Sequence, residues 1–186
     1  MNTEELTEKT ADSKLIFDGK VLKLYCDTVT CPDGRLATRE YCRHRGGVCV
    51  IPLTDDGELL CVSQYRYPHA EITVEIPAGK LEGKDADHRA AALRELKEET
   101  GADCDTLTYL GKVYPSPAIM DEIIYMYLAQ GLHFGQNQLD DDEFLEVKKI
   151  PLDELYSMLN DGKVPDAKTQ IAILRAREIY REKQNR

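Results

Sequence analysis

Short apolar runs separated by turn residues dominate the first half of the chain. They lie at residues 15–17, 21–30, 36–43, 48–53, 59–65 and 72–76, and turns such as Asp18-Gly19 and Pro32-Asp33-Gly34 stand between them. Runs of this length bounded by turn signals predict β-strands, and Asp-Gly predicts a hairpin. The unbroken Val, Ile and Leu content of 48–53 and 59–65 predicts burial on both faces of a sheet.

The second half of the chain has further apolar runs at 106–114, 122–129 and 144–150, which predict strands. Three other stretches have helical spacing. Residues 87–100 carry an apolar stripe and are followed by Gly101, which is typical of a helix C-terminus. Residues 152–159 and 168–182 predict two more helices. The stripe of the last helix is expected at Ile171, Leu174 and Ile179. We therefore expect an α/β protein, an α/β/α sandwich with a mixed sheet and an N-terminal antiparallel β ribbon.

The pattern also divides the chain. Residues 1–12 are polar and charged without a period, which predicts a disordered tail. Residues 13–45 form the predicted β ribbon, and residues 46–186 form the main domain. A chain of 186 residues is long enough to bury one core of ordinary size.

The helix predicted at 87–100 carries three carboxylates on the face opposite its apolar stripe: Glu95, Glu98 and Glu99. Like charges four residues apart destabilise a helix by about 0.2–0.5 kcal/mol, and carboxylates in the last turn oppose the helix dipole. A solvated acidic face is one interpretation. The other is a divalent cation that compensates the charge, because hard ions take carboxylate oxygens. Arg94 is placed to hold Glu98, and the turn at 77–79 brings backbone carbonyls beside the helix.

This stretch resembles the box of the Nudix hydrolases, G-x5-E-x7-R-E-U-x-E-E-x-G-U with U an apolar residue. Residues 94–102 match the second half of the box in full. In the first half, Asp85 stands where the family has Glu, and eight residues instead of seven separate it from Arg94. The resemblance implies a Nudix-type sandwich, a Nudix hydrolase domain at 46–186, and Mg²⁺ as cofactor, with Mn²⁺ as the alternative ion. It further implies that Glu95, Glu99 and the carbonyl of Ala78 bind the metal, while Glu98 orients these ligands or relays a proton.

Other segments resemble the ADP-ribose pyrophosphatase branch of this family. Arg66 lies in Gln-Tyr-Arg-Tyr-Pro before the box, and Arg39 precedes Glu40 on the ribbon. Guanidinium groups bind phosphate in a bidentate manner, so both are candidate substrate-binding residues. Without the resemblance, each would be read as a solvated surface arginine.

The branch also has a proline sixteen residues after the box glycine, and Pro117 stands at that distance from Gly101. The usual Ser-Pro-Gly appears here as Ser116, Pro117 and Ala118, followed by Glu122. The resemblance implies that all four contact the substrate. A strand-end surface carboxylate is the alternative for Glu122.

The acidic loop 140–143 precedes the run 144–150. From composition alone this loop is a solvated turn. In the enzymes it resembles, a loop carboxylate acts as general base or as an additional metal ligand. The resemblance assigns Glu143 to the metal-binding position, and Asp141 or Glu143 to the general base.

Composition limits the partners. The formal net charge of −10 argues against nucleic acid, which requires clustered Lys and Arg, but permits a small phosphorylated substrate. No apolar run approaches the roughly 20 residues of a membrane span, and the first residues lack the apolar segment of a signal peptide. We expect no membrane partner and a cytoplasmic protein. The six cysteines are expected to be reduced.

The acidic helix predicts metal-dependent hydrolysis, and the resemblance implies the substrate, so that we expect magnesium-dependent hydrolysis of the diphosphate of ADP-ribose to AMP and ribose 5-phosphate. Two alternatives remain at this point: a pyrophosphatase for another nucleoside diphosphate sugar, and a sensor that binds ADP-ribose or a related nucleotide without turnover. The resemblance implies that the ribbon at 13–45 forms a homodimer. A small intramolecular sheet is the alternative for the ribbon.

Overall fold

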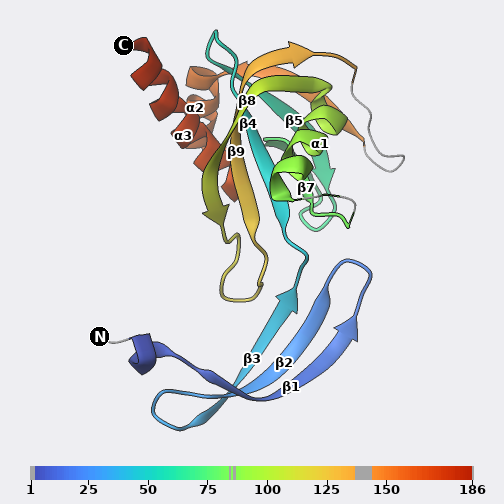
Figure 1. Ribbon diagram of the computed structural model, residues 1–186, viewed down its shortest axis with the longest axis vertical. Helices are drawn as coiled ribbons and strands as arrows, with labels where there is room; N and C mark the ends of the chain where they lie inside the picture. The colour runs from blue at the N-terminus through green and yellow to red at the C-terminus, as the bar shows by residue number, and fades with distance from the viewer. Residues whose placement is uncertain (1–2, 84, 86, 137–143, 186) are drawn as a thin grey trace. The chain divides into compact units, whose positions relative to one another are not determined.

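The computed structural model describes residues 3–83, 85, 87–136 and 144–185 (Figure 1). They form two compact units. The N-terminal unit contains the chain up to Gly46 together with Tyr114–Ile123, and the main unit contains Gly47–Val113 and the chain from Ile124 onward. The N-terminal unit thus includes the segment Tyr114–Ile123, which the sequence did not place with the ribbon.

The N-terminal unit is a three-stranded antiparallel sheet in the order β1-β2-β3. A short 3₁₀ turn, Thr3–Leu6, precedes the strands β1 (Lys9–Asp18), β2 (Lys23–Thr30) and β3 (Leu36–Arg43). Residues 9–12, expected in a disordered tail, belong to β1, where Lys9 pairs with Thr30. Their side chains are exposed, and strand pairing uses main-chain groups, so the apolar pattern carried no sign of this strand.

The segment Tyr114–Ile123 is fixed to β3 by main-chain hydrogen bonds. The N–H of Cys42 donates to the carbonyl of Ile119 (2.8 Å), and the N–H of Asp121 donates to the carbonyl of Cys42 (3.1 Å). Cys42 and Met120 thus form a parallel bridge. This bridge explains why a segment between two strands of the main unit belongs to the N-terminal unit.

The main unit contains two sheets. One is mixed, in the order β7-β4-β9-β8, with β4 and β9 parallel and the other pairs antiparallel. Its strands are β4 (Gly47–Pro52), β7 (Ala78–Lys80), β8 (Ala102–Val113) and β9 (Ile124–Phe134). The other sheet is antiparallel in the order β10-β5-β6. Its strands are β5 (Glu58–Arg66), β6 (Glu71–Glu75) and β10 (Leu145–Pro151).

Helices cover the sheets on two sides (Figure 1). The helices are α1 (His88–Thr100), α2 (Leu152–Asn160) and α3 (Ala167–Gln184). One apolar cluster joins Leu96 of α1 to Val48 and Val50 of β4, and another joins Ile51 of β4 to α2 and α3, where it includes Ile173. Every residue of β4 is buried, because the strand has a cluster on each face. The predicted α/β/α sandwich with a mixed sheet is confirmed.

The predicted stripe of α3 is buried only in part. Ile171 and Ile179 pack against the core, but Leu174 is exposed, and the fully buried residues of α3 are Thr169, Ala172, Ile173 and Ala176. The buried face thus contains small side chains that the apolar pattern did not reveal. None of the helices in the described part of the chain is long and apolar enough to cross a membrane.

Burial should make two of the six thiols unreactive. All six cysteines are free, but Cys49 and Cys61 are fully buried, and burial raises the pKa of each thiol to about 12. Because the thiolate is the reactive form, a thiol reagent at pH 8 should label neither residue in the native protein. Peptide mapping after labelling with and without denaturant checks this. Labelling of Cys49 or Cys61 in native protein at the rate seen for the half-exposed Cys104 would contradict the described core.

Candidate active site

Helix α1 has well-defined ends, which fix the direction of its acidic side chains. The side chain of Asp87 accepts a hydrogen bond from the N–H of Ala90 (2.8 Å) at the N-terminus. Gly101 ends the helix with a φ of 70°, and its N–H donates to the carbonyl of Lys97 (2.8 Å). A left-handed residue at this position favours glycine.

Two of the three carboxylates of α1 are buried. Glu95 is 6% exposed and Glu99 is 3% exposed, so the solvated-face interpretation fails for both. A buried carboxylate requires hydrogen-bond or ionic partners. The N–H of Ala78 donates to Oε2 of Glu99 (3.1 Å), and Nη1 of Arg94 donates to Oε1 of Glu95 (2.7 Å). Glu99 thus joins β7 to α1, whereas the contact between Arg94 and Glu95 lies within the helix.

Arg94 organises the acidic residues around one guanidinium group. Its Nη1 also donates to Oε2 of Glu98 (2.7 Å), as the sequence predicted. Its Nε and Nη2 bind the two carboxylate oxygens of Asp85 at 3.0 and 3.1 Å. The hydrogen bond to Asp85 is the largest cause of a raised Arg94 pKa, so the guanidinium stays charged. Asp85 reaches Arg94 although it is shorter than the Glu of the family and one residue further away in sequence.

Gly79 leaves the space that the carboxylate of Glu95 occupies. A Cβ atom at this position would lie 2.0 Å from the carboxylate of Glu95. Any other residue at 79 would displace that carboxylate, because the backbone of β7 is held against β4 through the pair Val48 and Gly79. A glycine is therefore required here by close approach and not by an unusual φ.

Two of the predicted metal ligands, Glu95 and Glu99, are placed to bind a hard divalent cation. Glu95 and Glu99 lie one helical turn apart, are buried, and adjoin the strand that begins at Ala78. Carboxylate and carbonyl oxygens are the ligands that Mg²⁺ prefers. The described residues contain no group of three or more His, Cys, Asp or Glu side chains arranged to hold a metal. The further predicted ligand, Glu143, and the candidate base Asp141 lie outside the described residues.

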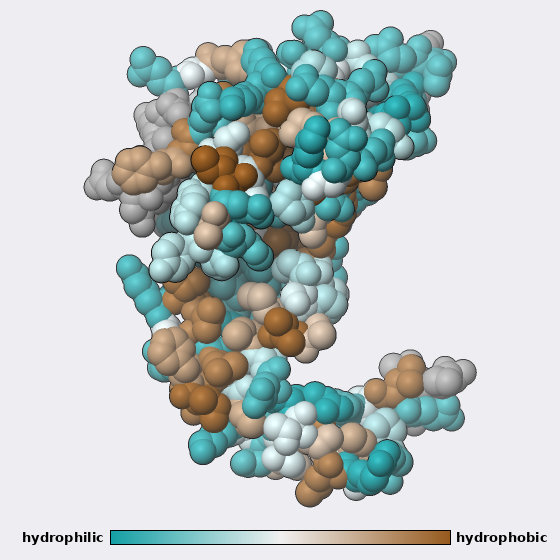
Figure 2. All heavy atoms as spheres, turned by 180° about the vertical axis from the view of Figure 1, so that it is seen from behind, coloured by the Kyte–Doolittle hydropathy of each residue, from teal (hydrophilic) through white to brown (hydrophobic). Residues whose placement is uncertain are grey.

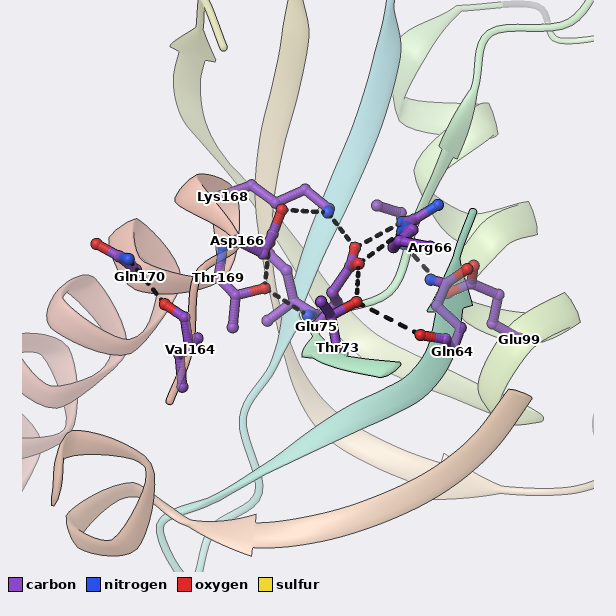
Figure 3. Close-up of polar contacts among 12 residues, drawn as sticks. Gln64, Arg66, Thr73, Glu75, Glu99, Val164, Asp166, Lys168, Thr169 and Gln170 are labelled. Atoms are coloured by element: carbon purple, nitrogen blue, oxygen red, sulfur yellow. Dashed lines mark hydrogen bonds and ion pairs between the residues drawn. The ribbon is translucent and has the colours of Figure 1, made fainter. Parts of the chain in front are cut away.

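Arg66, at the end of β5, is bound by a carboxylate that sequence reasoning missed. Its Nε and Nη2 each donate to one oxygen of Glu75, both at 2.6 Å, and Thr73 donates to the same carboxylate (2.7 Å; Figure 3). Glu75 is 2% exposed, whereas the Arg66 side chain is 39% exposed. The hydrogen bond to Glu75 raises the pKa of Arg66. The guanidinium is therefore anchored on its buried edge.

The first turn of α3 provides a second cation for Glu75. Nζ of Lys168 donates to Oε2 of Glu75 and to Oδ1 of Asp166 (2.8 Å). Burial by itself raises the pKa of Glu75, but the hydrogen bond from Arg66 and the charge and hydrogen bond of Lys168 outweigh it and lower that pKa to about 2. Glu75 gave one sequence signal, a charge in an apolar strand next to the box. Lys168 gave none, because it lies 93 residues away.

The other predicted substrate residues lie in the N-terminal unit. Nε of Arg39 donates to Oε2 of Glu8 (2.9 Å), and Nη1 donates to the carbonyl of Thr38 (2.9 Å). The hydrogen bond to Glu8 raises the pKa of Arg39. Arg39 thus binds a carboxylate of its own unit.

Residues 116–122 form a turn beside β3. The carbonyl of Ser116 accepts hydrogen bonds from the N–H groups of Ile119 and Met120 at 3.1 and 3.0 Å, and Pro117 and Ala118 are exposed. Ala118 does not have a positive φ, so an alanine in place of the usual glycine brings no backbone strain. Oε1 of Glu122 lies 3.0 Å from Nδ1 of His44, a partner that the sequence did not reveal.

The structure therefore brings Ala78, Glu95, Glu98 and Glu99 together in the main unit, which also contains Arg66. The N-terminal unit contains the remaining described candidates, which are Arg39, Ser116, Pro117, Ala118 and Glu122.

Comparisons with known proteins agree with this arrangement. The family model described as NUDIX domain matches residues 43–172. A methanol dehydrogenase activator from Bacillus methanolicus is 44% identical over 168 residues, covering 89% of this chain and 90% of the relative. An ADP-ribose pyrophosphatase from Bacillus subtilis (strain 168) is 42% identical over 172 residues, covering 91% and 92%.

A solved structure described as an ADP compounds hydrolase has the same fold. It superimposes with a TM-score of 0.81 at 22% identity, covering 96% of this chain and 97% of the other. At this identity the likeness concerns the fold alone.

Glu75 should make stability depend on pH in acid. Because its folded pKa of about 2 lies below the ordinary value of 4.5, its contribution is complete above pH 4.5 and disappears as the pH falls towards 2. The difference corresponds to about 3 kcal/mol at most. Urea unfolding at pH 7, 4 and 3 should show that wild-type protein has lost roughly half of this increment by pH 3, whereas Glu75→Gln lacks it throughout. The exposed Glu71→Gln on the same strand should behave as wild type; equal acid slopes for wild type and Glu75→Gln would contradict the assignment.

Proposed function

We propose that this chain, which belongs to the Nudix family and is a Nudix hydrolase, hydrolyses the diphosphate of ADP-ribose to AMP and ribose 5-phosphate in a magnesium-dependent reaction. Hydrolysis of a nucleoside diphosphate compound follows from the family and from its relatives. The observation that carries the proposal is the pair of buried carboxylates, Glu95 and Glu99, on a box helix organised by Arg94. The 42% identity to an ADP-ribose pyrophosphatase favours ADP-ribose as substrate.

Glu95, Glu99 and the carbonyl of Ala78 are the proposed ligands for Mg²⁺ or Mn²⁺. Nudix hydrolases generally use such ions, and a bound divalent cation supplies charge neutralisation of the diphosphate and a lower pKa for the attacking water. The chain's own contribution is to hold the ligands. Arg94 binds Glu95 and Glu98 through the same Nη1 atom. Because the two carboxylates share this donor, the position of Glu98 helps to orient Glu95.

The general base is assigned to the acidic loop that follows β9. In this proposal Asp141 or Glu143 accepts the proton of the attacking water, which requires one carboxylate oxygen within about 3 Å of it. Glu143 is the candidate for the additional metal ligand. The support for this assignment comes from the strand that follows these residues. β10 begins at Leu145 and pairs with β5, the strand that ends at Arg66.

Candidate substrate contacts are proposed in each unit separately. Arg66 is the proposed partner of the diphosphate or the terminal ribose, because its guanidinium is charged and anchored at one edge. Arg39, Glu122 and the turn 116–118 are the proposed contacts from the N-terminal unit. Guanidinium groups bind phosphate oxygens in a bidentate manner.

The N-terminal sheet is the proposed dimerisation element. It exposes several large apolar side chains, seen as hydrophobic atoms in the lower part of Figure 2. They include Leu15, Ile16, Phe17, Val21 and Leu36. Exposed apolar groups of this number on a single small sheet favour a second copy as their partner. We further propose a cytoplasmic location, which the six free cysteines support.

The second candidate is a different role for the same fold. The relative with 44% identity is named a methanol dehydrogenase activator, so this chain could serve to activate a dehydrogenase through the same chemistry. A nucleoside diphosphate sugar other than ADP-ribose remains the rival substrate, since the box helix determines the reaction and not the leaving group. A sensor without turnover is disfavoured by the intact Glu95 and Glu99.

A substrate panel tests the proposed reaction. Purified protein with Mg²⁺ is incubated with ADP-ribose, ADP-glucose, GDP-mannose, NADH and diadenosine polyphosphates, and the products are separated by chromatography. AMP and ribose 5-phosphate should form fastest from ADP-ribose. Faster cleavage of another compound would replace the substrate, whereas binding without any product would favour the sensor.

Glu99→Gln tests the metal site. The glutamine can still accept the hydrogen bond from the N–H of Ala78, so the fold should be kept. Turnover should fall by about a hundredfold or more, because a metal ion contributes several kcal/mol to the transition state. The matched control is Glu178→Gln, an exposed carboxylate of α3. Activity of Glu99→Gln near that of the control, at equal urea midpoints, would refute this site.

A further inference from the structure

Four side chains of alternating charge run from the N-terminus of α3 to the end of β5. They are Asp166, Lys168, Glu75 and Arg66, and each contacts the next through a hydrogen bond (Figure 3). Glu75 is the most buried member of the row, and Arg66 is the one member that is more than a quarter exposed. A row of this kind is a rigid support for its exposed end.

We propose that Lys168 and Glu75 are positioning residues that fix the guanidinium of Arg66 for the diphosphate of the substrate. The inference rests on the proposed function, in which Arg66 contacts the substrate. It adds that the first turn of α3, far from the box in sequence, determines how well that contact is made.

The geometry of Arg66 leaves one nitrogen for a ligand. Nε and Nη2 are both occupied by Glu75, so the guanidinium plane is set by the plane of a buried carboxylate. Among the described residues, Nη1 has no hydrogen-bond partner. A substrate oxygen can therefore bind at Nη1 without displacing Glu75, and the arginine loses little side-chain freedom on binding.

Lys168 controls the charge that Arg66 presents. Oε2 of Glu75 is shared between Nη2 of Arg66 and Nζ of Lys168, and Oε1 is shared with Thr73. With the ammonium present, Glu75 neutralises Arg66 only partly, so positive charge remains for an anion. Without it, the whole carboxylate charge faces Arg66, and Oε2 loses one of its two anchors.

The same turn of α3 also holds the strand that leads to the box. Asp166 caps the helix by accepting from the N–H of Thr169 (2.9 Å), and Oγ1 of Thr169 donates to Asp166 (2.5 Å). That Oγ1 accepts in turn from the N–H of Ile76 (2.9 Å), the residue after Glu75. Glu75 is thus fixed through both its side chain and the adjoining backbone.

The chain contains a matched pair for comparison. Lys163 binds Oδ2 of Asp161 (3.0 Å) with the same spacing of two residues as Lys168 and Asp166, but both side chains are exposed and neither contacts Glu75. Lys163→Met therefore removes the same charge at a similar place in the sequence. It should leave KM, kcat and stability unchanged.

The test measures KM and kcat of Lys168→Met, Lys168→Arg and the control Lys163→Met. The substrate is whichever nucleoside diphosphate compound the wild type cleaves fastest, so the test does not depend on ADP-ribose. The Kd of ADP from calorimetry is read in parallel, so that an effect on Arg66 is visible without turnover. Urea unfolding confirms that each variant is folded.

Lys168→Met should raise KM and the Kd of ADP about tenfold, in the range measured for directly interacting residues, with kcat within about twofold. Lys168→Arg should restore both values to within about twofold of wild type, because the charge returns. A fall in kcat with KM unchanged, or an equal effect of Lys163→Met, would overturn the inference while leaving the proposed reaction in place.

A double-variant cycle shows whether Lys168 acts through Arg66. Arg66→Lys keeps a cation beside Glu75 but cannot form the two parallel hydrogen bonds, so it should itself raise KM. Adding Lys168→Met to Arg66→Lys should then raise KM by no more than about a further twofold, because the guanidinium that Lys168 helps to position is already absent. If the double variant instead shows the product of the two single effects on KM, Lys168 does not act through Arg66.

Discussion

The main unit depends on supplying its buried carboxylates with hydrogen-bond and ionic partners. Glu75, Glu95 and Glu99 are all nearly inaccessible, in a chain whose formal charge is already −10. Leaving such a charge unpaired costs several kcal/mol. The fold meets this constraint by placing Arg94 between α1 and the preceding loop, and Arg66 and Lys168 on either side of Glu75.

Local spacing predicted the parts of the site that are close in sequence. The end of α1 at Gly101, the pairing of Arg94 with Glu98 and the burial of β4 all follow from neighbouring residues. The predictions failed where distant segments meet. The first residues of β1 carry no apolar pattern because they bond through the main chain, and the contact face of α3 was hidden by alanines and a threonine. Lys168 could not be assigned to Glu75 without knowing which strand the helix covers.

The proposed site residues are distributed over the two compact units. The proposed metal ligands lie in the main unit, on elements fixed by Gly79 and Arg94, where little can change without displacing a carboxylate. Several proposed substrate contacts lie instead on β3 and on the turn bridged to it.

Glu75 binds Arg66 of β5 and Lys168 of α3, and this affects the chain while it is being synthesised. Glu75 and Lys168 are separated by 93 residues, which a ribosome adds in roughly 5–20 s. Throughout that interval the strand next to the box carries a carboxylate whose second cation has not been synthesised. The end of β6 therefore cannot reach its final burial until α3 docks. A nascent chain that stops short of α3 has the complete box helix in its sequence but lacks the finished support for Arg66.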